Sequence, residues 1–361
     1  MPTVKINGTK INYMQLGSGP GADREDLVMV HGLAASMAFW YYHHVPEFAE
    51  RFRITLYDLR GHGRSGMPPG GYSAHNMAMD LRQLLDHLKI DRAHFVAHSF
   101  GGTVALHLAC MEPRKFESLL LLDTHISAVR GLAGITKWEF GEKVQEIFDR
   151  NNLEIDIRDP FFGYRLLTKI AQLRLGGGKI PDELKKLVGP FVLGRNSLRA
   201  ARQWLRLMDT TRAAEELMVD DGLSIQRFEK FDIPIMAVYG ERSQAMMTGE
   251  YLLRVWPGAF FRRIRNAGHF FPVTHPSDFI RVCRQFWDGS IQSEKPHRDG
   301  EPRRRHFRSD RFFREGDGWF FHTRESVPRG PFPHFKFARE GLQAYIATSV
   351  LLRDRFAVKV L

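Results

Sequence analysis

The chain has 361 residues, of which 43% are hydrophobic and 26% are charged, as in a globular protein that buries a large core. No apolar run is long enough to span a bilayer, which excludes a protein with transmembrane helices. The net charge is +11, and residues 291–361 hold 15 Lys and Arg against 9 Asp and Glu, which we interpret as a solvated linker and a basic small domain rather than a nucleic-acid or membrane contact.

The first residues, MPTVKINGTKINYMQLGSG, alternate apolar and polar side chains. This pattern predicts a β-hairpin, and it lacks the apolar core of a signal peptide. The two cysteines, Cys110 and Cys283, do not have the spacing of metal ligands, so we expect buried free thiols. We therefore expect a cytoplasmic protein.

Short apolar runs alternate with helical patterns up to Trp287. The predicted strands are 27–32, 53–58, 92–98, 118–123, 233–240 and 260–266. Such alternation predicts an α/β fold with a mostly parallel, doubly wound sheet and helices on both faces. Ligands of such sheets bind at the carboxyl ends of the strands.

The alternation stops over about 125–232, where only helical patterns occur. We predict an inserted helical region there. Within it, four arginines at helical spacing form one face of a helix, and four apolar residues form another. The arginines are Arg195, Arg199, Arg202 and Arg206, and the apolar residues are Leu198, Ala201, Leu205 and Met208. The arginine face is interpreted as solvated, with a basic rim for anionic substrates as the alternative.

The composition changes again after Trp287. Residues 291–302 are charged and rich in turn formers, which indicates a linker. The stretch that follows predicts strands joined at the tight turn GDG and then a helix, so we expect a small α+β domain over 303–361.

The segment VAHSFGGTVALHLA reads as a strand, a sharp turn and a helix, with Ser99 at the turn. A serine in such a turn takes strained backbone angles that expose its hydroxyl above the sheet. Ala97 and Gly101, two residues to either side, are small enough for the strand and the helix to approach closely. We predict that Ser99 is a nucleophile. His98 should alternate into the packing and be structural.

A serine nucleophile needs a general base and donors for the oxyanion. His269 follows the last predicted strand in NAGHFFPVTHPSDF, which places it at the same edge of the sheet as Ser99. The turn after the first long strand, in MVHGLAAS, can present the amide of Leu33 toward Ser99. We predict an oxyanion hole formed by the amides of Leu33 and Phe100.

With HGLAAS, DLRGHGRSG, AHSFGG and NAGHF in this order, residues 1–290 resemble the α/β-hydrolase fold superfamily. The resemblance implies that the helical region of about 125–232 is a cap over the active site. The remainder, with GWFFHTRES and RGPF, resembles a small uncharacterised bacterial domain fused to various proteins.

In this superfamily a catalytic aspartate usually occupies the turn where this chain has Ser243. Two other carboxylates could orient His269. Asp123 ends the strand before the cap, where some members of the superfamily carry their acid, and Glu241 lies two residues before the usual position. We favour Asp123.

These residues predict a serine hydrolase that cleaves a carboxylic ester or related acyl compound, with a largely apolar small-molecule substrate. The same residues could serve a carbon–carbon bond hydrolase or an acyl thioesterase. A dehalogenase or epoxide hydrolase is disfavoured because both need a carboxylate at position 99. Without a working acid, the protein would be a non-catalytic binding protein.

We expect no cofactor, no metal and no nucleic-acid partner. The segment GHGRSG (61–66) has the glycine spacing of a dinucleotide site, but it is followed by a Pro- and Gly-rich loop rather than by the helix that such a site needs.

Overall fold

The computed structural model describes most of the chain. Arg195 lies outside the described residues, and so does the expected linker at 291–302 except for its first residue, Ile291. The described ranges are 1–17, 24–129, 140–188, 197–228, 231–256, 258–291, 312–322, 328–342 and 344–345.

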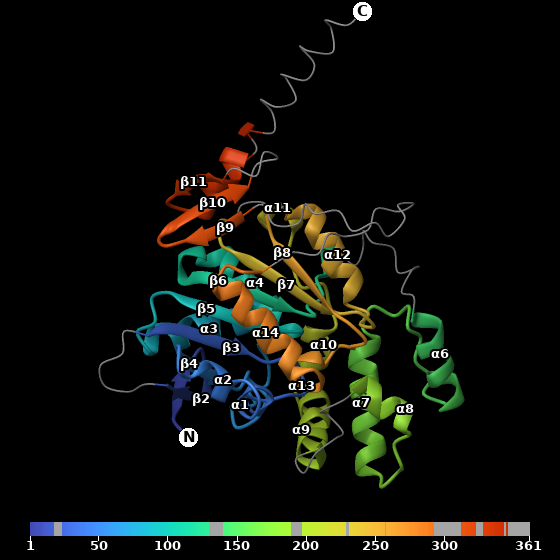
Figure 1. The fold of residues 1–361 in the computed structure, drawn as a ribbon. Helices are drawn as coiled ribbons and strands as arrows, with labels where there is room; N and C mark the ends of the chain where they lie inside the picture. Colours follow the sequence, from blue (N-terminus) through green and yellow to red (C-terminus); the bar gives the residue numbers. More distant parts are fainter. Residues whose placement is uncertain are drawn as a thin grey trace, which may run out of the picture.

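An eight-stranded sheet forms the centre of the molecule (Figure 1), in the order β1-β2-β4-β3-β5-β6-β7-β8. The amino-terminal hairpin β1-β2 is antiparallel, as expected, and all the pairs from β4 to β8 are parallel. The strands are β1 (Thr3–Ile6), β2 (Thr9–Leu16), β3 (Glu25–Val30), β4 (Phe52–Tyr57), β5 (Ala93–His98), β6 (Phe116–Leu122), β7 (Ile235–Gly240) and β8 (Phe260–Ile264). The predicted α/β class with a mostly parallel sheet is confirmed.

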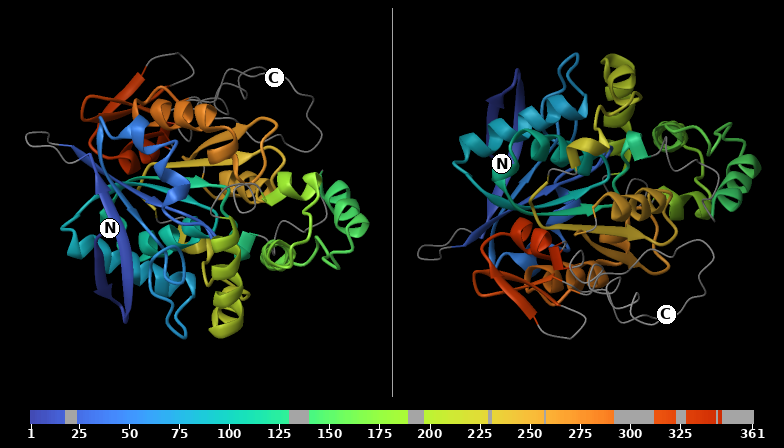
Figure 2. Two further views of the ribbon diagram at one scale, coloured as in Figure 1. Left: turned by 90° about the horizontal axis from the view of Figure 1, so that it is seen from below. Right: turned by 90° about the horizontal axis from the view of Figure 1, so that it is seen from above.

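Helices cover both faces of this sheet (Figure 2). Residues Phe95 and Ala97 of β5 belong to one apolar cluster with α3 and α4, whereas Val96 belongs to a second cluster with α1, α2 and α14. This alternation is what a strand buried on both faces requires. The helices are α1 (Ala38–Tyr41), α2 (Val45–Phe48), α3 (Ala74–His87), α4 (Phe100–Met111), α12 (Met246–Val255), α13 (Phe271–Thr274) and α14 (Pro276–Trp287), with a 3-10 turn at Pro113–Lys115.

The described residues between β6 and β7 form helices and loops, and we call this group of helices the cap. Its helices are α6 (Gly141–Arg150), α7 (Phe162–Leu175), α8 (Asp182–Val188), α9 (Ser197–Thr210), α10 (Ala213–Leu217) and α11 (Ile225–Phe228). The cap is joined to the loop before α3 by polar contacts. The Gln203 side-chain amide donates to the carbonyls of Gly61 and Gly63 at 3.1 Å, and a Glu216 carboxylate oxygen accepts from the amide of Gly71 at 2.7 Å. These bonds hold α9 and α10 against the main domain.

The buried face of α9 overlaps the expected apolar face in part, because Leu205 and Met208 are partly buried against the core. Leu198 is 40% exposed, whereas Ala201, Trp204 and Leu207 are buried. Trp204 and Leu207 are the larger apolar pair at helical spacing, and the helix turns that pair toward the core because it buries more apolar area. The side chains of Arg199, Arg202 and Arg206 are exposed. Their exposure favours the solvated interpretation of the arginine face.

A second, three-stranded antiparallel sheet follows near the carboxyl terminus, in the order β11-β10-β9. It comprises β9 (Phe312–Glu315), β10 (Gly318–His322) and β11 (Pro328–Phe332), and helical residues start at 335. The expected strands joined at the GDG turn are confirmed.

This small sheet lies against the amino ends of the main strands. Arg314 of β9 is 3.7 Å from the carboxylate of Glu117 at the start of β6, and the Phe335 ring touches Gly258 just before β8. Figure 1 shows β9 to β11 at one end of the molecule and the cap helices α6 to α9 at the other. The described residues of the small domain are therefore remote from the carboxyl ends of the strands.

Candidate active site

Ser99 occupies a strained turn between β5 and α4. Its backbone has φ 56° and ψ −127°, a conformation that is costly for a residue with a side chain. The Ser99 amide donates to the Leu122 carbonyl of the neighbouring strand at 2.8 Å, which holds the turn in place. The geometry matches the strained strand-to-helix turn expected from the sequence.

The turn is closely packed on all sides. A Cβ atom on Gly101 would come within 2.5 Å of the His31 carbonyl, and one on Gly102 would overlap the side chain of Thr124. A Cβ on Gly32 would lie 2.9 Å from Cβ of Ser99. These three glycines therefore let neighbouring segments of the chain pack closely around the Ser99 turn, in spaces that a side chain would fill.

His269 and Asp123 meet Ser99 in a connected row. His269 Nε2 lies 3.0 Å from Ser99 Oγ, and His269 Nδ1 lies 3.5 Å from Asp123 Oδ2. Ser99 and Asp123 directly follow the paired parallel strands β5 and β6, in which His98 is opposite Leu122. The three side chains thus come from the carboxyl ends of β5, β6 and β8, where the sequence predicted them to converge.

Asp123 is completely buried, and its backbone also has a positive φ of 49°. Burial raises the pKa of its carboxyl above the ordinary 3.8, although His269, Ser243 and the Gly240 amide each act in the opposite direction. Among the described residues, neither carboxylate oxygen accepts a hydrogen bond of regular geometry. A buried carboxylate with few hydrogen bonds to offset the loss of solvation favours a positively charged partner. His269 is placed to be that partner when it is protonated.

Ser243, which stands where the superfamily usually has its acid, is itself buried. Its Oγ accepts a hydrogen bond from the Ala245 amide at 3.1 Å, and its hydroxyl helps to keep the Asp123 pKa down. This role of Ser243 beside Asp123 was not predicted from the sequence. The sequence feature that could have indicated this role is the hydroxyl of Ser243 at a turn where the superfamily usually has a carboxylate.

The other candidate acid, Glu241, points elsewhere. One of its carboxylate oxygens accepts a hydrogen bond from the Asn266 amide at 2.7 Å, at the end of β8. This contact makes Glu241 a partner of the strand end rather than of His269.

The amides expected to form the oxyanion hole lie beside Ser99. Phe100 is the first residue of α4, so its N–H has no acceptor within that helix. Leu33 follows Gly32, whose backbone lies against Ser99, and the next residue, Ala34, has a positive φ of 56°. The Gly32 backbone therefore packs against Ser99, next to the residue whose amide is expected in the oxyanion hole.

The GHGRSG segment forms turns, with positive φ at Gly61 and Gly63, and α3 begins only at Ala74. Asp58 organises these turns, because its carboxylate accepts hydrogen bonds from the amides of Met37 and Arg64 at 2.8 Å. This segment is a structural loop. In the part of the chain that the structure describes, no three His, Cys, Asp or Glu side chains are grouped as metal ligands would be.

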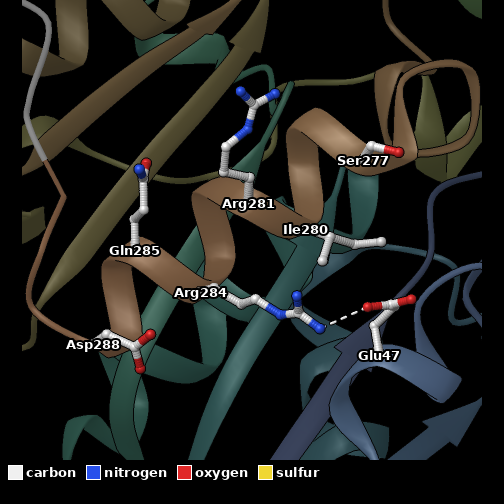
Figure 3. A pocket seen from close by; sticks show the side chains of 7 residues that line it. All are labelled: Glu47, Ser277, Ile280, Arg281, Arg284, Gln285 and Asp288. Carbon is white, nitrogen blue, oxygen red and sulfur yellow. Dashed lines mark hydrogen bonds and ion pairs between the residues drawn. The ribbon is translucent and has the colours of Figure 1, made fainter.

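A separate surface pocket lies along α14 (Figure 3). Ser99, His269 and Asp123 are not among the residues that line it. Its two arginines are already paired. Arg284 contacts the Glu47 carboxylate at 2.7 Å, and Arg281 contacts Asp278. The paired arginines leave little net positive charge for an anion.

Comparison with known proteins now adds to this geometry. Residues 27–168 match the family model of the alpha/beta hydrolase fold, and residues 297–351 match a domain of unknown function. A soluble epoxide hydrolase from Corynebacterium sp. strain C12 is 36% identical over 298 residues, which cover 78% of this chain and 95% of the relative. The chain belongs to the alpha/beta hydrolase fold family.

Solved structures of the alpha/beta hydrolase fold agree with this assignment. Est816, described as an N-acyl homoserine lactone degrading enzyme, has a TM-score of 0.54 and 24% identity, and the match covers 79% of this chain and all of Est816. The enol-lactonase of Burkholderia xenovorans LB400 has a TM-score of 0.54 and 19% identity, with coverage of 79% and 99%. At these identities the similarity establishes the fold alone.

The comparisons confirm both predicted resemblances: an alpha/beta hydrolase, and a small domain of unknown function behind it. The protein is thus a hydrolase of the alpha/beta fold. Across the described residues, every helix is too short or too polar to cross a bilayer.

Proposed function

We propose that this hydrolase cleaves a carboxylic ester or a related acyl substrate through an acyl-enzyme intermediate formed on Ser99. The observation that carries the proposal is the 3.0 Å contact between His269 Nε2 and Ser99 Oγ, with the Asp123 carboxylate behind the other ring nitrogen. A serine hydroxyl becomes a nucleophile when an adjacent base removes its proton and a third group orients that base.

In the first half of the reaction, Ser99 Oγ attacks the substrate carbonyl carbon while its proton passes to His269 Nε2. The amides of Leu33 and Phe100 stabilise the negative charge that develops on the carbonyl oxygen. His269 then gives the proton to the leaving alcohol oxygen, and the acyl group remains as an ester on Ser99.

In the second half, His269 takes a proton from a water molecule as the water attacks the acyl carbon. The carboxylic acid leaves, and the proton returns to Ser99 Oγ. Asp123 stays ionised throughout, holds the proton of His269 on Nδ1 and stabilises the imidazolium form. The net change is one ester and one water giving one acid and one alcohol.

The relative named as an epoxide hydrolase raises a second reaction, which the chemistry of Ser99 disfavours. A carboxylate that opens an epoxide forms an ester, and water can hydrolyse that ester. A serine hydroxyl that opened an epoxide would instead form a stable ether, and turnover would stop. The serine at position 99 therefore supports a carbonyl substrate.

The surroundings of Ser99 support an apolar acyl group. Leu33 and Phe100 are partly buried and pack against the apolar cluster that includes Trp204 and Leu207 of the cap. An apolar wall beside a few polar groups is the usual lining of a small-molecule site. We propose residues 1–290 as the catalytic unit, with the cap at about 125–232 and a separate small domain at 303–361.

A fluorophosphonate probe tests the nucleophile directly. The wild type should be labelled, and Ser99→Ala should not be. Purified enzyme should also hydrolyse p-nitrophenyl esters or acyl thioesters of graded chain length and should leave styrene oxide unchanged. Equal labelling of both proteins, or diol formation without ester hydrolysis, would overturn the proposal.

A further inference from the structure

Two buried histidines donate hydrogen bonds to the segment 265–272, which carries His269 and runs into α13. His98 Nε2 lies 2.9 Å from the carbonyl oxygen of His269 itself, and His44 Nε2 lies 2.9 Å from the carbonyl oxygen of Pro272. His98 is the last residue of β5, and His44 lies between α1 and α2. Both side chains are almost entirely inaccessible to solvent.

The two imidazoles act as neutral donors. Burial lowers the pKa of His98 well below its ordinary value and lowers that of His44 to about 4. A neutral imidazole has one N–H, and a carbonyl oxygen can only accept, so the proton of His98 belongs on Nε2. Its Nδ1 makes no hydrogen bond within the described part of the chain. His44 Nδ1 is 3.3 Å from the Trp40 carbonyl, a longer contact than the one to Pro272.

Aromatic neighbours hold both rings in these orientations. The His98 ring stacks on Phe39, with centroids 4.8 Å apart and planes inclined by 20°. The His44 ring packs edge to face against Trp40 at 5.2 Å and against Phe279 at 5.3 Å. A buried ring packed in this way cannot turn without displacing its neighbours.

We propose that His98 and His44 are positioning residues that hold segment 265–272 at two carbonyls, one in the loop and one in α13, and so keep the base in register with Ser99. We call this pair of contacts the clamp. The carbonyl that His98 holds belongs to the base itself. Reaction rates fall by about a hundredfold when a reacting group moves by about 1 Å. The clamp thus explains how His269, which lies in a loop, keeps its 3.0 Å contact with Ser99. This inference rests on the proposed function, since its effect is measured on the Ser99 reaction.

Substitution of His98 separates the hydrogen bond from the packing. His98→Phe keeps a ring but removes the donor, and His98→Gln keeps an N–H donor. We expect His98→Phe to lower kcat for a p-nitrophenyl ester by about 10- to 100-fold with KM changed less than twofold. His98→Gln should recover at least fivefold of that loss. His44→Phe and His44→Gln should follow the same order with a smaller effect, because Pro272 lies further from the base.

His94 offers a matched control. It lies on the same face of β5 as His98, four residues earlier, and it is also buried. It contacts the Ser118 hydroxyl at 2.7 Å, far from the reacting atoms. His94→Phe should change the melting temperature about as much as His98→Phe does and should leave kcat within twofold of the wild type.

The outcomes distinguish the clamp from the proposed function. If the wild type reacts through Ser99 but His98→Phe keeps the wild-type kcat, the clamp is refuted and the proposed function stands. If His98→Phe and His98→Gln are equally slow, or if His94→Phe is as slow as either, the effect comes from packing and the inference is overturned. If the wild type is not labelled at Ser99, the proposed function fails, and the clamp fails with it.

Discussion

Replacing Asp123 by asparagine should slow ester hydrolysis by about 10³- to 10⁴-fold while the protein remains folded. The magnitude follows from the 3.5 Å distance between Asp123 Oδ2 and His269 Nδ1. At an effective dielectric constant of about 20, two unit charges at this separation attract by about 5 kcal/mol. Each 1.36 kcal/mol corresponds to about tenfold in rate, and removal of a triad carboxylate typically costs about 10⁴.

The same substitution should raise the stability of the fold at neutral pH. Burial raises the pKa of the Asp123 carboxyl above the ordinary 3.8 that it has in the unfolded chain. The folded protein therefore holds the proton more tightly, and that stabilisation is present below about pH 3.8 and is lost as the pH rises through the raised pKa. At pH 7 the wild type must keep a buried carboxylate ionised, whereas the asparagine variant does not. We expect a higher melting temperature for Asp123→Asn at pH 7 and a smaller difference below pH 4.

The assay is the release of p-nitrophenol from a short acyl ester, with kcat and KM measured over a pH series and melting followed in the same buffers. Glu241→Gln is the control, because Glu241 is bonded to the Asn266 amide, and its kcat should stay within twofold of the wild type. Slow turnover by Glu241→Gln with normal turnover by Asp123→Asn would transfer the role to Glu241. If neither change mattered, neither carboxylate would act on His269, and a binding protein without a working acid would become the better description.

Further predictions concern the surroundings of the site and the small domain. Ser243→Asp, made in the Asp123→Asn background, should restore at least tenfold of the lost kcat, since Ser243 is buried beside Asp123; no recovery would mean that a carboxylate there cannot reach His269. Gly102→Ala should lower soluble yield and esterase activity, because its Cβ would overlap Thr124; a fully active variant would refute that packing argument. Phe335→Ala should lower stability to denaturant by about 3 to 5 kcal/mol and leave kcat unchanged, because Phe335 is buried at the opposite end of the strands; a loss of kcat at full folding would instead connect the small domain to the site.

The local features of the fold could be predicted because their causes lie within a few residues of one another. The turn at Ser99 needs small residues at 97, 101 and 102, and the sequence AHSFGG displays them directly. Apolar runs bounded by turn residues predicted the strands from β3 to β8, since the part of a strand that is buried on both faces is mostly apolar. His269 follows the last of these strands, and parallel strands share one carboxyl edge, so His269 was expected to lie near Ser99.

The cap and the small domain were predicted less completely. Helical spacing predicted α9 and an apolar face on it, but only packing against the core decided that Trp204 and Leu207 would be its most buried large side chains. Composition separated residues 303–361 from the rest of the chain. It could not indicate that this domain rests on the amino ends of the strands, because Arg314 and Glu117 meet only in the folded molecule.

The sequence alone predicted the kind of chemistry, because the proposed nucleophile, base and amide donors each stand in a short motif that a local turn requires. Which carboxylate lies next to His269 Nδ1 depends on the folded chain. Asp123 and Glu241 both end strands at the same edge, and the choice depends on which side chain faces His269 once β6, β7 and β8 are aligned. The bond from His98 to the carbonyl of His269 likewise joins positions 171 residues apart. Such contacts have no local signature, since they arise from the order and register of the sheet rather than from neighbouring residues.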